Sequence, residues 1–312
     1  MGLIEELKEI LGNEEKRMEI IKAELQEVRD RYSDDRRTEI EHNAEDFSYE
    51  DMIPNEEVVI TVSHQGYVKR TALTEYRTQG RGGVGSKGVS TKEDDFTEYL
   101  FTASTHNYLL IFTDKGKLFW LKTYAIPEGA KTSKGRPIQN LINIELDDKI
   151  RSIIQVESLD DQDYLNNHFL VMITKKGIIK KTTLEQYSRP RTNGIIALNI
   201  REDDQLVNVN MTNGRQHIVI AVKSGRAIHF PETSVRPMGR TATGVKAITL
   251  NQDKDYVIGM VCASEENATL LVVSEKGYGK RSDLEEYRIT NRGGKGVKAM
   301  NVTEKNRSFS CN

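Results

Sequence analysis

Residues 66–87, GYVKRTALTEYRTQGRGGVGSK, recur near the end of the chain as residues 277–298, GYGKRSDLEEYRITNRGGKGVK. The two stretches align without a gap over 22 positions, of which 13 are identical. Chance does not produce such agreement within a chain of 312 residues, so the sequence contains an internal repeat. The shared pairs Leu73 and Leu284, and Tyr76 and Tyr287, are expected to pack between neighbouring units.

Short apolar runs rich in β-branched residues mark the start of each repeat unit. Five runs of this kind occupy residues 58–62, 108–112, 169–173, 218–222 and 270–273. The glycines that follow them are Gly66, Gly116, Gly177, Gly225 and Gly277, which lie 50, 61, 48 and 52 residues apart. Such runs are typical of strands joined in hairpins, and a unit of about 50 residues can form one four-stranded blade. We therefore predict a mainly β, propeller-like fold with five visible blades.

The residues before the repeat have a helical pattern instead. Apolar side chains from Ile4 to Tyr32 recur at intervals of three and four, which places them on one face of a helix. Gly12 and Asn13 interrupt this pattern as a helix-ending glycine and a helix N-cap. Two helices are therefore expected.

The charge of the chain is divided unevenly. Residues 1–55 hold 17 acidic and 8 basic side chains, a net charge of −9, whereas the rest hold 30 acidic and 37 basic side chains, a net charge of +7. The end of the acidic part is polar, which is typical of a linker. The predicted organisation is a helical segment at 1–41, an acidic linker at 42–55 and a β domain at 56–312.

Composition excludes several classes of protein. No apolar run approaches the ~18 residues of a membrane span, and the start of the chain shows no signal-peptide pattern. The two cysteines, Cys262 and Cys311, form neither a disulfide framework nor a metal site, and Cys262 is expected to lie in the core. The prediction is a cytoplasmic protein that does not contact a membrane.

Each repeat unit also contains a loop in which glycines and cations occur together, most clearly at residues 78–85 and 290–296. Glycine lets a backbone approach a phosphate closely and expose its amide groups, while Arg or Lys supplies charge. One such loop per blade would space the cations regularly, which suits the backbone of duplex DNA better than a small ligand. The candidate DNA-binding residues are Gln79, Arg81, Gly82, Gly83, Gly85, Lys87, Lys131, Lys134, Arg136, Arg191, Arg240, Lys246, Arg292, Gly293, Gly294, Lys295 and Lys298.

Other interpretations of these residues are less favoured. Residues 80–85 also match GxGxxG, but no βαβ pattern surrounds them and no acidic residue lies about 20 positions on, which disfavours a dinucleotide site. The loops could simply be turns that need positive φ, although this leaves their cations unexplained. A propeller can also serve as a protein-interaction scaffold. A hydrolase is the weakest alternative, because the six histidines show no metal-ligand spacing.

Four short motifs resemble the family of DNA gyrase A subunits: HQGYVKR at 64–70, GRP at 135–137, GYGKR at 277–281 and, before the repeat, RRTEI at 36–40. The resemblance extends from about Leu3 to Thr303 and concerns the C-terminal domain with the end of the preceding helical segment of the breakage-reunion domain. It implies a six-bladed β-pinwheel that wraps DNA around its rim and supports ATP-dependent negative supercoiling in the bacterial cytoplasm, on the chromosome. The partners that it implies are the gyrase B subunit and a second A subunit, in an A2B2 assembly.

The resemblance implies no catalytic residue and no cofactor in this chain, since ATP and Mg²⁺ are used by other parts of that assembly. The family's box, Gln-Arg-Arg-Gly-Gly-Lys-Gly, corresponds to residues 79–85, where Gly80 and Val84 replace cations. Fewer cations in the box imply weaker wrapping of DNA. The A subunit of topoisomerase IV is therefore an alternative assignment. The residues after Thr303 do not continue the pattern, so the domain is expected to be truncated before a sixth blade.

Overall fold

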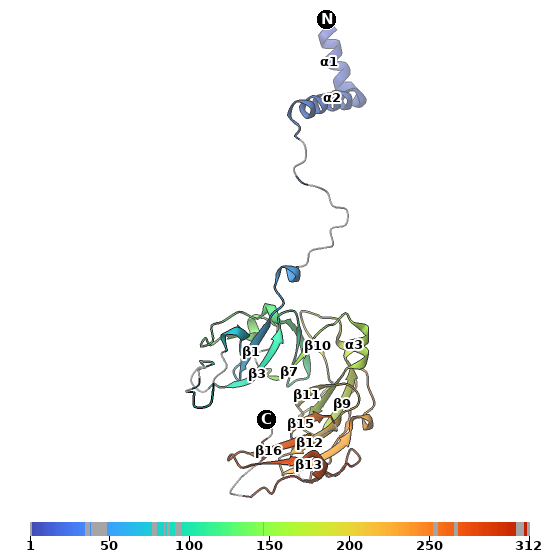
Figure 1. Cartoon of the computed structure of the whole chain (residues 1–312). Helices are drawn as coiled ribbons and strands as arrows, with labels where there is room; N and C mark the ends of the chain where they lie inside the picture. The colour runs from blue at the N-terminus through green and yellow to red at the C-terminus, as the bar shows by residue number, and fades with distance from the viewer. Residues whose placement is uncertain are drawn as a thin grey trace. The chain divides into compact units, whose positions relative to one another are not determined.

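The structure is a computed structural model, and its chain separates into two compact units, Met1–Asp51 and Met52–Asn312 (Figure 1). The residues that it describes are 2–34, 38, 49–76, 80–83, 85, 88–90, 95–145, 147–251, 255–264, 268–303 and 309–310. None of the helices in these residues is both long enough and apolar enough to cross a membrane.

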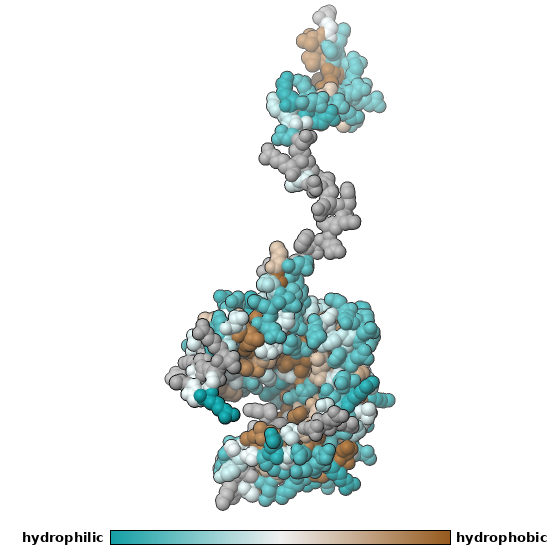
Figure 2. Space-filling view, in the orientation of Figure 1, coloured by the Kyte–Doolittle hydropathy of each residue, from teal (hydrophilic) through white to brown (hydrophobic). Residues whose placement is uncertain are grey.

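The first unit contains the two expected helices, α1 (Gly2–Gly12) and α2 (Glu14–Tyr32). Asn13 caps α2, because its side-chain oxygen accepts a hydrogen bond of 3.0 Å from the amide of Glu15. The helix break predicted at Gly12 and Asn13 is therefore confirmed. Neither helix buries a residue, and apolar surface over α1 is visible in Figure 2.

The second unit consists of five antiparallel sheets, which follow one another in an arc in Figure 1 and are called blades 1 to 5. In sheet order, blade 1 contains β3 (Thr97–Ser104), β1 (Glu57–Ser63), β2 (Tyr67–Ala72) and β6 (Arg136–Pro137). Blade 2 contains β10 (Ile195–Ile196), β5 (Lys117–Lys122), β4 (Tyr108–Thr113) and β7 (Ile150–Val156). Blade 3 contains β11 (Leu206–Thr212), β8 (Phe169–Thr174), β9 (Ile178–Thr183) and β14 (Val245–Lys246). Blade 4 contains β15 (Val257–Ala263), β12 (His217–Val222), β13 (Arg226–Pro231) and β18 (Val297–Lys298).

In the described residues, blade 5 contains three strands, namely β17 (Gly279–Asp283), β16 (Thr269–Ser274) and β19 (Phe309–Ser310). Short helices occupy the connections in this unit. They are η1 (Tyr49–Met52), which begins in the first unit, η2 (Leu73–Glu75), η3 (Thr123–Ala125), η4 (Ile138–Asn140), α3 (Gln162–Asn167), η5 (Leu184–Tyr187), η6 (Glu232–Ser234) and η7 (Leu284–Glu286).

The five repeat glycines all lie in the hairpin turns of the blades, as the sequence predicts. They are Gly66, Gly116, Gly177, Gly225 and Gly277, with φ between 78° and 83°. In each turn the glycine amide donates to the carbonyl three residues earlier, at 2.9 to 3.0 Å. A positive φ of this size is inexpensive only for glycine, so the turn explains why this residue type recurs.

The repeat units are not self-contained, because each of the first four blades takes its fourth strand from the unit that follows in sequence. The strand β6 pairs with β2 through Val68 and Arg136, although the two residues belong to successive units. The strands β10, β14 and β18 pair in the same way with β5, β9 and β13. The glycine loops of units 2 to 5 therefore each lead the chain back to the preceding blade.

Hydrophobic cores lie between successive blades. On β4, Leu109 and Ile111 pack in one core with residues of blade 1, whereas Leu110 and Phe112 pack in another core with residues of blade 3. A central blade is thus buried on both faces. This explains why the strand sequences are continuous apolar runs and do not alternate with polar residues.

Candidate nucleic-acid interface

Four loop glycines are required by the return of the chain to the preceding blade. At Gly135, Gly194 and Gly244 a Cβ atom would lie only 2.6 to 2.8 Å from a backbone carbonyl oxygen of the preceding blade, and Gly296 faces Ala227 O in the same way. All four have positive φ. These glycines serve the architecture, so the interpretation of the loops as special turns is correct for them.

The first glycine loop is different, because it stands clear of the blades. Gly85 occupies the same repeat position with φ of 77°, yet no atom lies within 4 Å of where its Cβ would be, and the same is true of Gly80 and Gly82. Arg81 and Gly83 are exposed in this loop. Two other candidates of this unit, Gln79 and Lys87, lie outside the described residues.

In the second loop, two cations are exposed and one is partly covered. Lys134 and Arg136 are exposed on either side of Gly135. Lys131 is half-buried, and its Nζ lies 4.7 Å from the centre of the Tyr76 ring. An ammonium over an aromatic face is attracted to its π system, so Lys131 is tied to blade 1 as well as available at the surface.

The third and fourth loops each have one exposed candidate cation. Arg191 is exposed, and its carbonyl accepts a hydrogen bond of 3.1 Å from the amide of Gly194. Arg240 is half-buried, and its amide donates to Gln186 Oε1 at 2.7 Å. Lys246, in β14, is exposed.

The fifth loop shows that not every predicted cation points away from the protein. The guanidinium of Arg292 donates to the carbonyls of Ser234 and Lys246, each at 3.1 Å, and both acceptors belong to the preceding unit. Gly293 donates its amide to Ala247 O at 2.6 Å, and the carbonyl of Gly294 accepts from the amide of Thr249 at 2.8 Å. Arg292, Lys295 and Lys298 are all exposed in this loop. The guanidinium of Arg292, however, is held by the carbonyls of Ser234 and Lys246.

In blades 1 to 4 a side chain on the strand after the hairpin turn also holds the following blade, a feature that sequence reasoning missed. Four residues after the turn glycine, Arg70 Nε donates to Ile126 O at 2.8 Å and Trp120 Nε1 donates to Tyr187 O at 2.9 Å. At the same position His229 Nδ1 donates to Tyr287 O at 2.6 Å. Because these donors are Arg, Trp and His, no single residue type marks the position in the sequence.

In blade 3 this position is an ion pair. Lys181 Nζ lies 2.7 Å from Glu232 Oε1 in blade 4, and both side chains are buried. Thr212 and the amide of Gln216 also donate to Glu232, which satisfies its buried oxygens. A buried pair of this kind fixes geometry more than it adds stability.

A repeated aspartate fixes the hairpin turns, and it too was missed. Asp95, Asp148, Asp204 and Asp255 each accept a hydrogen bond from the amide that precedes the turn glycine, at distances of 2.9 to 3.4 Å. Each aspartate lies two residues before the first residue of the next strand of its own sheet. That position was the only signal in the sequence, and aspartate before a strand is too common to single out.

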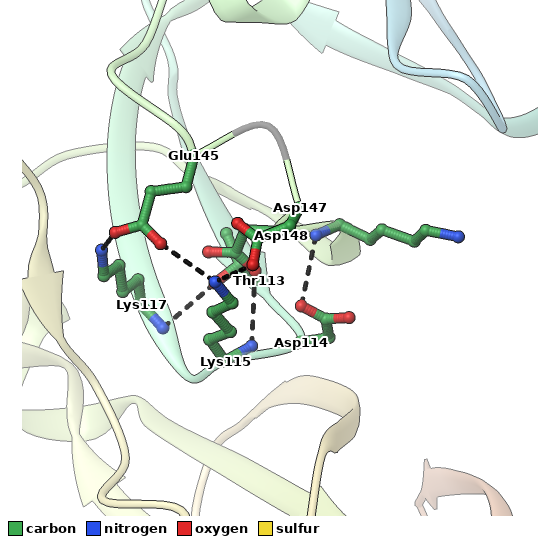
Figure 3. A network of polar contacts seen from close by, with 8 residues as sticks. Thr113, Asp114, Lys115, Lys117, Glu145, Asp147 and Asp148 are labelled. Atoms are coloured by element: carbon green, nitrogen blue, oxygen red, sulfur yellow. Dashed lines mark hydrogen bonds and ion pairs between the residues drawn. The ribbon is translucent and has the colours of Figure 1, made fainter.

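In blade 2 the aspartate belongs to a larger polar network (Figure 3). Lys115 Nζ lies 2.9 Å from Glu145 and 2.8 Å from Asp147, and Lys117 also contacts Glu145, at 2.5 Å. Hydrogen bonds from Lys117 and Lys115 lower the pKa of Glu145 to about 2. Burial and the neighbouring carboxyl of Asp114 raise the pKa of Asp148 to about 6. These lysines are therefore neutralised by carboxylates and do not extend the cationic surface.

Comparison with known proteins relates this geometry to a family. The family described as the DNA gyrase C-terminal domain, a beta-propeller, matches residues 57–104, 107–157, 168–213, 216–264 and 268–307, which correspond to the five repeat units. The chain belongs to this family. The resemblance predicted from the motifs and the propeller-like fold are thus confirmed.

Relatives of the gyrase family cover the chain from end to end. The DNA gyrase A subunit of Staphylococcus aureus strain NCTC 8325 is 45% identical over 313 aligned residues, which is 100% of this chain and 35% of that protein. The same protein from strain COL is also 45% identical over the same share. The chain therefore spans about a third of the length of the curated relatives that it matches.

Two solved structures share the fold at comparable similarity. The C-terminal domain of DNA topoisomerase IV superposes with a TM-score of 0.67 at 27% identity, covering 83% of this chain and 77% of that one. The DNA gyrase A C-terminal domain superposes with a TM-score of 0.66 at 25% identity, covering 81% of each chain. The E. coli ParC C-terminal domain, at 14% identity and a TM-score of 0.58, shows the fold alone.

Proposed function

We propose that this chain binds duplex DNA without sequence preference and wraps it, as part of a gyrase A subunit that supports ATP-dependent negative supercoiling. The observation that carries the proposal is the recurrence of exposed cations at the fourth strands of successive blades. Lys246 and Lys298 occupy equivalent positions on the fourth strands of blades 3 and 4, Arg136 lies one register position earlier on the fourth strand of blade 1, and Arg191 lies four residues before β10 of blade 2. Cations along the same edge of blades 1 to 4 form a track with one anchor in each of these four blades.

The chemistry of these residues suits a DNA backbone. Arg and Lys contacts to phosphates supply affinity without reading base sequence, and glycine-rich segments let backbone amides approach the phosphates. A track that continues from blade to blade can also hold a bent duplex, since bending 20 to 30 base pairs costs on the order of 1 to 6 kcal/mol and needs contacts along the whole bend. In the first loop the Cβ positions of Gly80 and Gly82 have no atom of the described residues within 4 Å, so this loop is the anchor best able to follow a phosphate.

We also propose a domain organisation, partners and a cellular location for this chain. Residues 1–41 would be the end of the breakage-reunion domain's helical segment, 42–55 a linker and 56–312 the DNA-binding domain. The partners would be the gyrase B subunit, together with a second copy of the A subunit, in the bacterial cytoplasm on the chromosome. The chain itself would perform no bond chemistry, and ATP and Mg²⁺ would act elsewhere in the assembly.

A topoisomerase IV A subunit is the second candidate. It is favoured by the superposition on that enzyme's C-terminal domain and by Gly80, which stands where the gyrase box has a cation. The 45% identity to gyrase A subunits over the whole chain favours gyrase. Both candidates bind DNA with the same track, so they differ in wrapping and not in binding.

The test of DNA binding is its dependence on salt. If about five loop cations contact phosphates, log K falls with log salt at a slope of roughly −4 to −5, at about −0.9 per contact. Fluorescence anisotropy with a labelled duplex at several salt concentrations measures this slope. A slope near zero would favour the protein-interaction scaffold instead.

A further inference from the structure

Two lysines are buried directly beneath glycine loops. Three residues after the turn glycines of blades 1 and 3, Lys69 and Lys180 have exposed fractions of 1% and 0%. Among the described residues neither ammonium has a carboxylate within 4.0 Å, and burial lowers the pKa of Lys69 although the more distant charge of Glu75 opposes this. A buried charge without a counter-ion is costly, so its surroundings must compensate it in another way.

Backbone carbonyls provide that compensation, and some of them belong to the loop of the next unit. Lys69 Nζ donates to Ala130 O at 3.1 Å, to Lys131 O at 2.5 Å and to Gly88 O of its own unit at 3.3 Å. An ammonium has three donors, and all three are used. Lys69 thus connects blade 1 to the second glycine loop.

Lys180 repeats this arrangement two blades later. Its Nζ donates to Ala197 O of its own unit at 2.8 Å and to Arg240 O in the loop of the next unit. Arg240 lies four residues before Gly244, as Lys131 lies four residues before Gly135, so the two lysines hold equivalent carbonyls. In both cases the carbonyl belongs to a candidate DNA-binding cation.

The contacts fix the direction of the loop peptides. All peptide bonds of the described residues are trans, and in a trans peptide the C=O and the following N–H point in opposite directions. The carbonyls of Lys131 and Arg240 point inward to the ammonium groups, so the amides of Thr132 and Thr241 point away from them. Thr132 and Thr241 are exposed, and neither amide has a hydrogen-bond partner in the described parts of the chain.

We propose, on the basis of the proposed DNA-binding function, that Lys69 and Lys180 are positioning residues that orient loop amides of the next blade toward a DNA phosphate. The lysines do not contact DNA themselves. They pre-form the donors at Thr132 and Thr241, next to the cations Lys131 and Arg240. An anchor that is ordered before binding loses less entropy when the phosphate arrives.

Blades 2 and 4 show that a lysine is not needed at this position for folding, although blade 5 has the exposed Lys280 there. Phe119 in blade 2 and Ile228 in blade 4 occupy it, and both are buried beneath the following loop. The protein thus accepts apolar side chains of similar size here. Burial, and then the charge of Arg240, lower the pKa of Lys180 to about 8, which is the expected result of keeping an unpaired ammonium inside the protein.

The experiment replaces each lysine by an apolar side chain of similar length in the 312-residue chain. Lys180→Met and Lys69→Met are compared with Ile228→Met, which changes the same position in blade 4 without removing a donor. Three quantities are measured for each variant: the Tm, the Kd for a duplex of about 30 base pairs, and the slope of log K against log salt. Arg240→Ala serves as the reference for a direct phosphate contact.

We expect Lys180→Met and Lys69→Met to change the Tm little, because removing a buried charge offsets the carbonyls left without a donor. The Kd should rise about threefold to tenfold, which corresponds to weakening, and not full loss, of one hydrogen bond to a charged acceptor. The salt slope should stay unchanged, whereas Arg240→Ala should lessen it by about 0.9. Ile228→Met should alter neither binding quantity. This pattern distinguishes orientation of amides from direct charge contact.

Two results would overturn the proposal. If both lysine variants remain folded and bind within twofold of the wild type, the lysines do not position the loops. If both lose Tm along with affinity, the lysines stabilise the blade interface rather than the anchor. Failure of the wild-type chain to bind DNA would instead reject the proposed function, so the two failures are distinguishable.

Discussion

At the scale of single residues, the loop glycines divide into those that the fold requires and those that leave the loop free. Gly244 has φ of 101°, and a Cβ there would lie 2.6 Å from Ile179 O. Gly82 has φ of 83°, but nothing lies within 4 Å of its Cβ position. The same residue type therefore has two physical roles in one repeat.

Alanine substitutions separate these roles. Gly244→Ala combines the left-handed backbone, which costs about 1 to 2 kcal/mol, with a clash against backbone that costs about 1 to 3 kcal/mol. Gly82→Ala has only the cost of the left-handed backbone, because no backbone atom of the described residues lies near its Cβ position. Urea unfolding of the two variants should therefore show a loss of about 3 kcal/mol for Gly244→Ala and about 1 kcal/mol for Gly82→Ala. Equal losses would contradict the close approach seen at Gly244.

The pair of Asp114 and Asp148 makes stability depend on pH. The pKa of Asp148 is raised from 3.8 to about 6, so between these values the folded protein binds more protons than the unfolded chain. Stability must then fall as pH rises from about 4 to 6 and stay lower above 6. Asp148→Asn cannot ionise, so it should be more stable than the wild type at pH 7.5, by on the order of 1 to 2 kcal/mol. The difference should shrink at pH 4.5 in thermal melts, and a constant difference would contradict this assignment.

At the scale of elements, neighbouring blades are joined by side-chain hydrogen bonds as well as by apolar packing. Trp120 in β5 donates to the buried Tyr187 O at the end of η5. Trp120→Phe keeps an aromatic ring but leaves this carbonyl without the donor, which should cost about 1 to 3 kcal/mol. Chemical unfolding measures the loss. A change of less than about 0.5 kcal/mol would show that the blades are joined by packing alone.

The strand arrangement shows what could be predicted from the sequence and what could not. The five hairpins were predictable, because only glycine adopts the turn at Gly66 and its equivalents without cost and because apolar runs precede them. The exchange of the fourth strand was not predictable, since strands such as β6 and β10 have only two residues each and leave no periodic pattern. Pairing of such short strands depends on contacts far apart in the sequence.

The prediction of interface residues from the sequence has a similar limit. Sequence spacing finds the loops and their cations, but the direction of a side chain depends on the carbonyls near it. Arg292 therefore faces the preceding blade, although its position in the loop matches that of Arg81. Lys69 and Lys180 look like ordinary surface cations in the sequence, and only the fold shows that they are buried.

At the scale of the whole molecule, Arg81 and Arg292 offer a matched test of wrapping. Both are exposed and precede the last glycine of their loop by four residues, but the guanidinium of Arg292 donates to two carbonyls of the preceding unit, whereas Arg81 lies beside Gly82, whose Cβ position has no atom of the described residues within 4 Å. Arg81→Ala should leave the Tm unchanged, and Arg292→Ala should lower it, because the charged donors of Arg292 are worth roughly 1.5 to 3 kcal/mol. The effects on DNA wrapping should have the reverse order: Arg81→Ala should reduce wrapping, and Arg292→Ala should not.

A wrap requires anchors around the whole bend, so the loss of one should affect wrapping more than binding. We expect Arg81→Ala to weaken binding to a short duplex by no more than about tenfold, since the other loops still hold it. Relaxed circular DNA religated in the presence of this variant should lose most of the linking-number change that the wild-type chain produces. At a temperature where both variants are folded, Arg292→Ala should keep that change, because its side chain supports the blade and not the DNA. If Arg81→Ala shifts the linking number as far as the wild type does, the first loop is not the anchor, and the topoisomerase IV assignment, in which binding does not lead to tight wrapping, becomes the better one.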